Sequence, residues 1–427
     1  MLKIIDLRNK KSFSFRSFAE SKSTDKVERT VATVLQTVQR KGDAALRFYT
    51  KKFDRIELTD IRVSSKEINA ALKYADEKFL AVLKKSAANI RRFHQQQVRK
   101  PFVMRVGGGS ELRQIIRPME RVGVYVPGGK AAYPSTVLMN VIPAQVAGVK
   151  EIHLVSPPGA NGTVHPDVLI AAAVLGVKNI YRIGGAHAIA ALAYGTETVP
   201  AVDKIVGPGN IFVATAKKMV YGVVGIDSFA GPSEVVILAD NSAHPTFIAS
   251  DLLAQAEHDE RAVPILVTTS RSLAEKVNAE INRLLDAQPR KHILATSLHA
   301  EGRIYVVASL QQGIMVTNEI APEHLEIITT KNETVLQQIN HAGSIFLGNY
   351  SPVAIGDYFA GPNHVLPTGR TARFSSPLSV DDFIKKSSVI YYTQKKMEEV
   401  ADEVAMFAER EQLAAHALSL RLRKGAH

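Results

Sequence analysis

The sequence predicts an α/β protein with two doubly wound (incomplete Rossmann-like) parallel-sheet domains, a helical N-terminal region and a small helical C-terminal tail domain. Short aliphatic runs alternate with segments of helical periodicity, and this alternation restarts near Gly231. Such alternation is typical of parallel sheets covered by helices on both faces. The chain has 427 residues, of which 46% are hydrophobic. That length allows about two to four domains, each with its own core.

The composition excludes several classes of protein. The absence of Cys rules out a disulfide framework, a thiolate metal site and cysteine catalysis. No apolar run approaches the ~20 residues needed to span a bilayer, and the N-terminus lacks the apolar core of a signal peptide. We therefore expect a cytoplasmic protein that binds no membrane. The formal net charge is +12, but Lys and Arg are spread along the chain, so we expect no nucleic-acid partner.

The region before residue 120 is predicted to be mostly helical. Thr24 and Asp25 can cap a helix in which valines recur at helical spacing, and a second helix is predicted over 68–87. The three glycines at 107–109 predict a turn.

Two series of strand–helix units follow. The first consists of the strand and helix ranges 122–126 and 135–149, 152–156 and 165–177, 179–184 and 186–194, and 203–207 and 211–221. The second consists of 235–239 and 245–256, 264–268 and 272–285, 304–308 and 310–319, 325–329 and 334–342, and a last strand over 344–348. The end of the chain, 395–424, reads as one or two amphipathic helices that are too short for an independent core.

Ligands in open α/β sheets bind in the loops that follow strands. Five loops are rich in Gly and polar residues, at 127–135, 184–190, 207–212, 230–234 and 349–370. The G-x-G-x-x-G motif is absent, so no ordinary dinucleotide-binding fold is indicated. The GPGN segment at 207–210 opens a predicted helix, where free N–H groups favour an anion such as a pyrophosphate. The alternative is a tight turn that binds nothing.

Three further patterns place imidazoles beside oxygen donors. Helical spacing puts Asp251, Gln255 and His258 on one arc beside an apolar stripe, which suits either a metal site or an exposed polar flank. Glu323 and His324 precede a predicted strand and offer two bases of different pKa for proton transfer. The pairs Asp357 with His364 and Glu411 with His416 add further donors. Without thiolates, this donor set is consistent with zinc or a similar borderline metal.

Taken together, these segments resemble histidinol dehydrogenase from end to end. The resemblance is carried by YVPGGKAAYPSTVLMN, GPGNIFVATAK, AGPSEVVILAD, ASDLLAQAEHD, APEHLEI, GSIFLG, GDYFAGPNHVLPT and EREQLAAH, in the order and at the spacing of the family. It implies two successive NAD-linked oxidations of L-histidinol, through L-histidinal to L-histidine, which is the last step of histidine biosynthesis.

The resemblance also implies a set of site residues. One Zn²⁺ per subunit would be held by Gln255, His258, Asp357 and His416, with His324 as the general base and Glu323 activating the water that hydrates the aldehyde. NAD would contact Tyr125, His187 and Asn210. The family usually has Gln where this chain has His187, so NAD binding is the point at which the chain departs from the pattern. The substrate-contact positions are Ser233, Gln255, His258, His324, Asp357, His364, Glu411 and His416.

The family is an intertwined homodimer in which the tail of each subunit completes the partner's site. On one straight helix, Glu411 and His416 would lie roughly 140° apart, so a break between them or a tail lying across the site is expected. The domains implied are an N-terminal arm (1–22), a first α/β domain with the metal and catalytic residues (23–120 plus 234–378), a second on the NAD side (121–233), and an exchanged C-terminal tail (379–427). The alternatives are a related zinc and NAD dehydrogenase of another small amino alcohol or polyol, and a non-enzymatic metal-binding protein.

Overall fold

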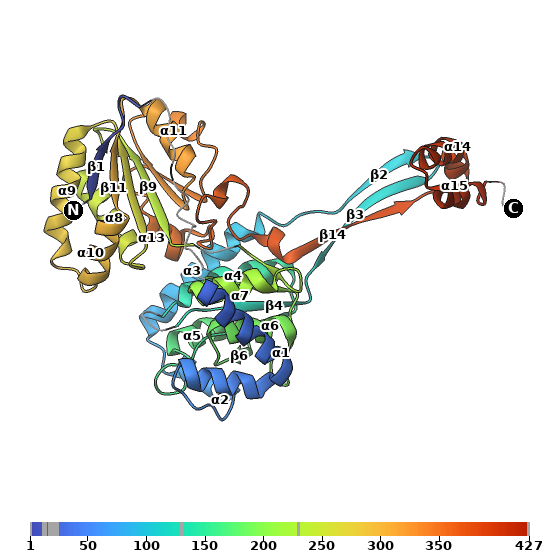
Figure 1. The fold of residues 1–427 in the computed structure, drawn as a ribbon, viewed down its shortest axis with the longest axis horizontal. Coiled ribbons are helices and arrows are strands. Elements are labelled where there is room, and N and C mark those ends of the chain that lie inside the picture. The colour runs from blue at the N-terminus through green and yellow to red at the C-terminus, as the bar shows by residue number, and fades with distance from the viewer. Residues whose placement is uncertain (1, 11–14, 16–24, 129–131, 229–230, 425–427) are drawn as a thin grey trace. The chain divides into compact units, whose positions relative to one another are not determined.

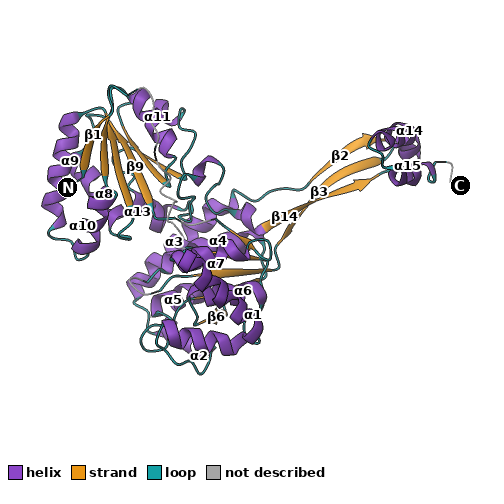
Figure 2. Ribbon diagram, viewed as in Figure 1, coloured by secondary structure: helices purple, strands orange, loops and turns teal. Residues whose placement is uncertain are grey.

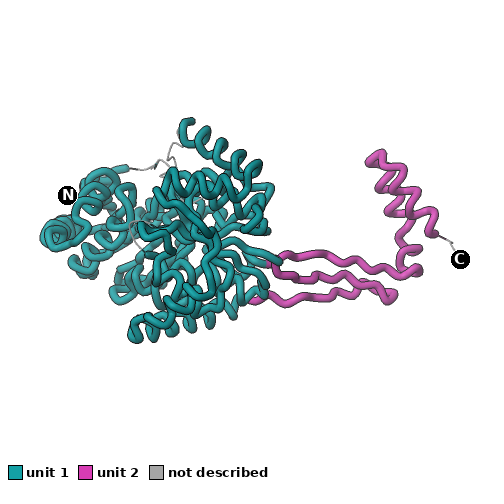
Figure 3. The backbone as a smooth tube through the Cα atoms, turned by 90° about the horizontal axis from the view of Figure 1, so that it is seen from below, with its two compact units in different colours: residues 1–97, 120–383 teal, residues 98–119, 384–427 magenta. Residues whose placement is uncertain are grey.

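The computed structural model describes residues 2–10, 15, 25–128, 132–228 and 231–424 (Figure 1). Two compact units are distinguished in Figure 3. Unit 1 comprises Met1–Gln97 and Glu120–Phe383, and unit 2 comprises Val98–Met119 and Ile384–His427. This division differs from the expected boundaries, because residues 98–119 belong with the C-terminal tail rather than with either α/β domain.

Unit 1 contains a six-stranded parallel sheet in the order β1-β11-β10-β9-β12-β13 (Figure 2). Apolar side chains from α8, α9 and α10 cover one face of this sheet, and those from α11 and α12 cover the other. The strands are β1 (Lys3–Asp6), β9 (Glu234–Ala239), β10 (Val263–Thr268), β11 (Arg303–Val306), β12 (His324–Ile328) and β13 (Ser344–Leu347). The helices are α8 (Pro245–Ala256), α9 (Arg271–Leu285), α10 (Lys291–Ala300), α11 (Leu310–Ile320), α12 (Asn332–Leu336) and α13 (Val353–Ile355).

The second sheet of unit 1 has five parallel strands in the order β6-β5-β4-β7-β8. Its strands are β4 (Arg121–Tyr125), β5 (Glu151–Val155), β6 (Asn179–Tyr181), β7 (Lys204–Val206) and β8 (Gly225–Ile226). The accompanying helices are α1 (Asp25–Phe53), α2 (Ser65–Lys73), α3 (Glu77–Gln95), α4 (Pro134–Ala147), α5 (Pro166–Val174), α6 (Gly185–Tyr194) and α7 (Ile211–Val220).

Helix α1 shares a hydrophobic core with α6 and α7, so the helical N-terminal region packs on the five-stranded sheet. The expected domain boundaries placed residues 23–120 in one domain with residues 234–378, which form most of the six-stranded sheet. Strand β1 also differs from expectation, because it pairs with β11 instead of forming part of a separate arm. Short helical turns follow β13 in unit 1, at Gly356–Ala360, Thr371–Arg373 and Val380–Phe383.

Unit 2 is an antiparallel three-stranded sheet followed by two helices. Its strand order is β14-β3-β2, with β2 (Phe102–Gly107), β3 (Ser110–Pro118) and β14 (Ile384–Tyr391). The expectation of a mostly helical N-terminal region is therefore wrong for residues 102–118, although the predicted glycine turn joins β2 to β3. Helices α14 (Gln394–Arg410) and α15 (Ala414–Arg421) are separated at Gln412, whose φ is 63°. This break between Glu411 and His416 is one of the two arrangements expected.

Candidate functional site

Glu323 and His324 lie at the amino end of β12, between β9 and β13. Helix α11 ends at Ile320, and Ala321 takes a left-handed conformation that turns the chain into the strand. His324 is opposite Val235 of β9 and Ser344 of β13. Glu323 therefore precedes the strand and His324 begins it, which confirms the predicted position of the pair at the entry to a strand.

Hydrogen bonds from β9 hold both side chains. The main-chain N–H of Glu234 donates to Oε2 of Glu323 at 2.8 Å, and Nδ1 of His324 donates to the main-chain carbonyl of Glu234 at 3.0 Å. In the neutral imidazole this assignment leaves Nε2 of His324 as an acceptor. In the described part of the chain Nε2 has no hydrogen-bond partner, and it lies 3.8 Å from Oδ1 of Asp357. The imidazole is thus oriented with one nitrogen available for proton transfer.

The carboxyl groups of Glu323, Glu234 and Asp357 lie near this imidazole, and the pKa values of Glu234 and Asp357 are shifted in opposite directions. Burial raises the pKa of Glu234 to about 8, and the charge of Glu323 adds to the effect. Burial would also raise the pKa of Asp357, but its contact with His324 and the charge of that imidazole outweigh burial, so the pKa lies below its ordinary value. At neutral pH, Glu234 is therefore mostly protonated while Asp357 is ionised.

The pKa of His324 reflects two opposing effects. Burial lowers it, but the negative charges of Glu323 and Asp357 outweigh burial and raise the pKa well above the usual value for histidine. His364 lies nearby and donates from Nδ1 to the main-chain carbonyl of Asp357 at 3.1 Å. Burial lowers the pKa of His364, so this second imidazole is neutral. Ser233 precedes Glu234 in the same segment, and its carbonyl accepts a hydrogen bond from the N–H of Val263.

Three of the four predicted zinc ligands belong to unit 1. Gln255 is buried in the last turn of α8, whereas His258 lies beyond the end of that helix and is exposed. The predicted common arc of Asp251, Gln255 and His258 is therefore wrong, because the helix ends at Ala256. Asp251 instead forms a hydrogen bond with Glu326, which is buried in β12.

No group of three or more His, Asp or Glu side chains within the described ranges is placed to hold a metal ion. The donor set nevertheless fits zinc in kind. Asp357 is held ionised, as a metal ligand must be, and His258 supplies an imidazole. Gln255 is buried, and its amide oxygen would be the atom that binds the metal, because the amide nitrogen is a hydrogen-bond donor only.

The fourth predicted ligand, His416, lies in unit 2 together with Glu411. Glu411 caps the C-terminus of α14, and His416 lies in the first turn of α15. Both side chains are exposed. Unit 2 also exposes apolar side chains that could pack against other protein, including Ile390, Tyr391, Met406, Phe407 and Leu418.

The three predicted NAD contacts line one pocket of about 340 Å³, here called the Tyr125 pocket. Tyr125 ends β4, whereas His187 and Asn210 follow β6 and β7, so the carboxyl ends of neighbouring strands bring them together. Oδ1 of Asn210 accepts from the N–H groups of Phe212 and Val213 and caps α7. The described lining is Thr30, Val31, Val34, Phe53, Asp54, Tyr125, Gly128, Pro157, Pro158, Gly185, Ala186, His187, Asn210 and Phe212.

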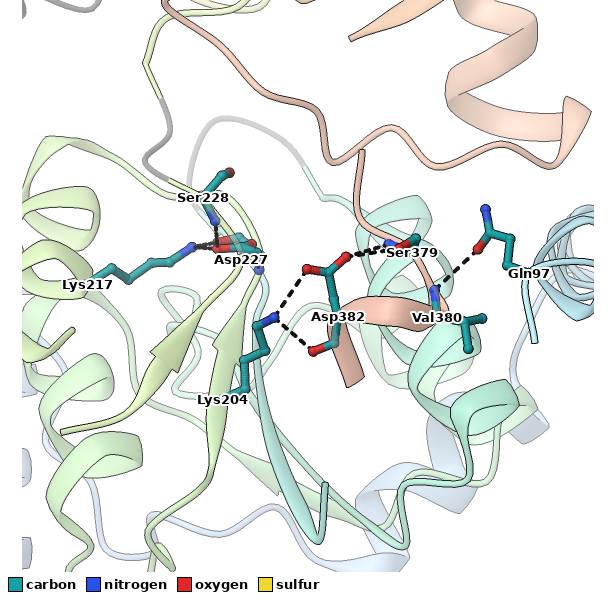
Figure 4. A network of polar contacts seen from close by, with 9 residues as sticks. Gln97, Lys204, Lys217, Asp227, Ser228, Ser379, Val380 and Asp382 are labelled. Carbon is teal, nitrogen blue, oxygen red and sulfur yellow. Dashed lines mark hydrogen bonds and ion pairs between the residues drawn. The ribbon is translucent and has the colours of Figure 1, made fainter. Parts of the chain in front are cut away.

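The GPGN loop beside this pocket is held from behind by a buried ion pair between Lys217 and Asp227 (Figure 4). Nζ of Lys217 donates to the carbonyl of Gly207 at 3.0 Å, and Oδ2 of Asp227 accepts from the N–H of the same glycine at 2.7 Å. Figure 4 also shows Nζ of Lys204 donating to Asp382, both to its main-chain carbonyl and to its side chain. The contacts of Lys217 and Asp227 with Gly207 fix the carboxyl ends of β7 and β8, whereas Lys204 is the first residue of β7.

Sequence reasoning did not single out Glu234, Asp54 or the Lys217–Asp227 pair. Glu234 follows Ser233 in a quoted motif, but nothing in the sequence shows that its carboxyl group is buried near Glu323. Asp54 is a single acid after a helix, and the ion pair joins residues whose proximity depends on the sheet. The positions of these side chains became clear only from the folded structure, which brings together segments that are distant in the sequence.

Comparison with known proteins identifies relatives that carry the same name. The sequence model of the histidinol dehydrogenase family matches residues 18–424. Histidinol dehydrogenase from Bacillus subtilis (strain 168) is 53% identical over 401 residues, which cover 94% of each chain. The enzyme of that name from Clostridium acetobutylicum is 51% identical over 411 residues, covering 96% of this chain and 95% of the relative.

The solved structures agree with this. The crystal structure of histidinol dehydrogenase from Elizabethkingia anophelis matches with a TM-score of 0.92 at 38% identity, covering 99% of this chain and 98% of that one. The resemblance and the fold class inferred from the sequence are thereby confirmed. Within the described ranges, no helix has the length and apolar character required to cross a membrane.

Proposed function

The chain belongs to the histidinol dehydrogenase family, and we propose that it oxidises L-histidinol through L-histidinal to L-histidine in two NAD-linked steps, with one Zn²⁺ per subunit. It is an oxidoreductase of histidine biosynthesis, and we propose a cytoplasmic location for it. The observation that carries the chemical proposal is the orientation of His324, whose Nδ1 is bonded to the carbonyl of Glu234 while Nε2 is left available.

In this proposal His324 removes the proton from the alcohol of histidinol. A proton already on Nε2 must leave first, because Glu323 and Asp357 raise the pKa of this imidazole. Histidinol carries a positive ammonium group, and its charge opposes that of a protonated His324. Substrate binding therefore favours the neutral imidazole that the first oxidation requires.

Glu323 is proposed to activate water in the second step. Its Oε2 is held by the N–H of Glu234, so the carboxyl group is fixed beside His324 rather than free to rotate. The aldehyde must be hydrated before a second hydride can leave, and a fixed carboxylate is suited to accept a proton from that water. Hydride transfer itself belongs to the nicotinamide cofactor, so the protein supplies orientation and proton transfer.

Gln255, His258, Asp357 and His416 would hold the zinc ion. When bound, the metal would act as a Lewis acid for the amino and imidazole nitrogens of histidinol, once the ammonium group has lost its proton. Ser233, His364 and Glu411 are proposed as further substrate contacts. The carboxylates of Asp357, Glu323 and Glu411 would favour a cationic substrate locally in a chain whose net charge is +12. Tyr125, His187 and Asn210 are proposed to contact NAD in the Tyr125 pocket.

A second copy of the chain is proposed to complete the site. Glu411 and His416 are exposed on unit 2, and that unit carries exposed apolar side chains such as Phe407 and Ile390. Exposed apolar surface of this kind marks protein–protein contacts. In a homodimer the tail of one subunit would bring Glu411 and His416 to the partner's metal and substrate residues.

The deciding experiment follows NADH by its absorbance when the purified, zinc-loaded protein is mixed with limiting L-histidinol and excess NAD⁺. We expect two NADH per histidinol, loss of turnover on chelation and recovery with Zn²⁺. One NADH per histidinol would contradict the second oxidation and the role of Glu323. Turnover of another amino alcohol or polyol, but not of histidinol, would favour the alternative of a related dehydrogenase.

A further inference from the structure

Two buried polar atoms of the Tyr125 pocket lack a hydrogen-bond partner among the described residues. They are Oδ2 of Asp54 and Nδ1 of His187, and both residues line the pocket. Buried polar groups in native proteins are nearly always satisfied, and each exception calls for an explanation. Because both residues line one cavity of about 340 Å³, a polar ligand in that cavity is placed to supply the missing partners.

Asp54 is the source of negative charge in this pocket. It follows the last residue of α1, and its N–H donates to the carbonyl of Thr50, so the backbone continues the helical turn and places Asp54 in the lining of the pocket. Burial raises the pKa of Asp54 to about 6, which shows that the carboxylate lacks compensating contacts. No Lys or Arg is among the residues described in the lining.

His187 contributes a neutral imidazole. Burial lowers its pKa to about 3, and its Nε2 lies 3.2 Å from the hydroxyl of Thr50. Whichever tautomer is present, one donor and one acceptor are shared between its two ring nitrogens. His187 therefore adds hydrogen-bonding capacity but no charge, and discrimination by charge in this pocket falls to Asp54.

The remaining lining indicates which part of a dinucleotide would lie here. Val31, Val34, Phe53 and Phe212 provide apolar and aromatic surface suited to a base. Neither Glu323 nor His324 is part of the described lining. The half of the cofactor that does not react, the adenosine half, therefore fits this pocket best.

We propose that Asp54 accepts hydrogen bonds from the ribose hydroxyls of the adenosine half and so selects NAD over NADP. The inference rests on the proposed NAD-linked function. A carboxylate that binds a ribose 2′-hydroxyl in this way excludes the 2′-phosphate of NADP by charge repulsion and by the loss of the donor.

The test measures binding rather than turnover. The full-length, zinc-loaded protein and the variant Asp54→Asn are titrated calorimetrically with NAD⁺, NADP⁺ and ADP-ribose, which lacks nicotinamide. We expect Asp54→Asn to weaken NAD⁺ and ADP-ribose by about ten-fold and to leave NADP⁺ unchanged or tighter. Thermal unfolding without ligand should show a melting temperature equal to or above that of the wild type, because a poorly compensated carboxylate is removed.

Asp60→Asn is the matched control, since it removes an exposed carboxylate of unit 1 that does not line the pocket. Asp60→Asn should leave the affinities for NAD⁺ and NADP⁺ unchanged. If the wild type and Asp54→Asn bind NAD⁺ with equal affinity, the inference is overturned and the proposed function stays intact. The same holds if Asp54→Asn loses affinity for NAD⁺ and NADP⁺ by equal factors. Absence of NAD⁺ binding by the wild type would overturn both. If Asp54→Asn fails to fold, Asp54→Ser is titrated in its place with the same expectations.

Discussion

Nδ1 of His324 donates to the main-chain carbonyl of Glu234 across the β9–β12 pair, at 3.0 Å. The same residue of β9 donates its N–H to Glu323. One peptide segment therefore orients both members of the proposed general-base pair, and it does so through main-chain atoms that only a proline at residue 234 would alter. The tautomer of His324 and the direction of its free nitrogen are consequences of parallel strand register.

His324→Gln should lower kcat by about 10²- to 10⁴-fold, the usual contribution of a positioned general base. The affinity for NAD⁺ should be unchanged, because His324 does not line the Tyr125 pocket. Steady-state kinetics and titration with NAD⁺ measure the two effects separately. His292→Gln, at an exposed position of α10, serves as the control and should retain full activity. Activity of His324→Gln within a few-fold of wild type would contradict the role of His324.

The buried carboxyl group of Glu234 should make stability depend on pH. Its pKa is about 8 in the folded protein against 4.5 ordinarily, so the folded state keeps a proton that the unfolded state loses. Stability is therefore full below pH 4.5 and falls as pH rises toward 8, by an amount on the order of 4 kcal/mol. Glu234→Gln should match the wild type at pH 4.5 and exceed it at pH 8 in denaturant unfolding. Parallel pH profiles for the two proteins would show that Glu234 is not the titrating group.

The parallel sheets could be predicted because their strands are buried on both faces and read as short apolar runs. The run predicted over 122–126 is β4, Arg121–Tyr125, and that over 344–348 is β13, Ser344–Leu347. The hairpin of β2 and β3 was missed although β2 contains a short apolar run, because the region was interpreted as helical and most of β2 is exposed. Its partner β14 lies far along the chain, and pairing over that separation leaves no local pattern.

The site could be predicted only in part, for a similar reason. The motifs containing Glu323 and Asp357 identified candidate residues; Glu323 is adjacent to His324 in the sequence, but the approach of Asp357 to His324 depends on the fold. The prediction that His258 shares a helix face with Asp251 and Gln255 was wrong because α8 ends two residues before His258. Glu234 was missed because it acts through its main-chain N–H and carbonyl. Nearly every residue has these groups, so the sequence does not distinguish those of Glu234.

Lys217→Met should destabilise the protein by about 3–5 kcal/mol, because it leaves Asp227 buried without its cation. The side chains of Lys217 and Asp227 are only 3% and 4% exposed. Lys218→Met, next in the chain but 66% exposed in its side chain, should cost less than about 1 kcal/mol. Denaturant unfolding compares the two variants. Similar losses for both would show that burial of the ion pair does not determine its contribution.

Gly207→Ala should be more harmful than Gly222→Ala. Both glycines have φ near +105°, at +108° and +105°, so an alanine is strained by the backbone at either position. A Cβ on Gly207 would lie 2.1 Å from the carbonyl oxygen of Tyr125, whereas one on Gly222 would meet nothing within 4 Å. The difference between the two melting temperatures isolates this clash. Equal melting temperatures would mean that the β4 and β7 ends separate without cost.

Mixed dimers test whether the site is shared between subunits. His416→Ala removes a proposed zinc ligand from unit 2, and Asp357→Ala removes one from unit 1. Each variant alone should be inactive. If the tail acts in trans, a dimer with one chain of each kind has one site with both substitutions and one with neither.

Random pairing after co-refolding makes about half of the dimers mixed, so about a quarter of wild-type activity should return. Refolding each variant with the double variant is the control, because no mixed dimer then has an intact site, and activity should stay absent. Activity in the Asp357→Ala and His416→Ala mixture that equals this control would show that Glu411 and His416 do not complete the partner's site. The measured fraction thus distinguishes a shared site from one built within a single chain.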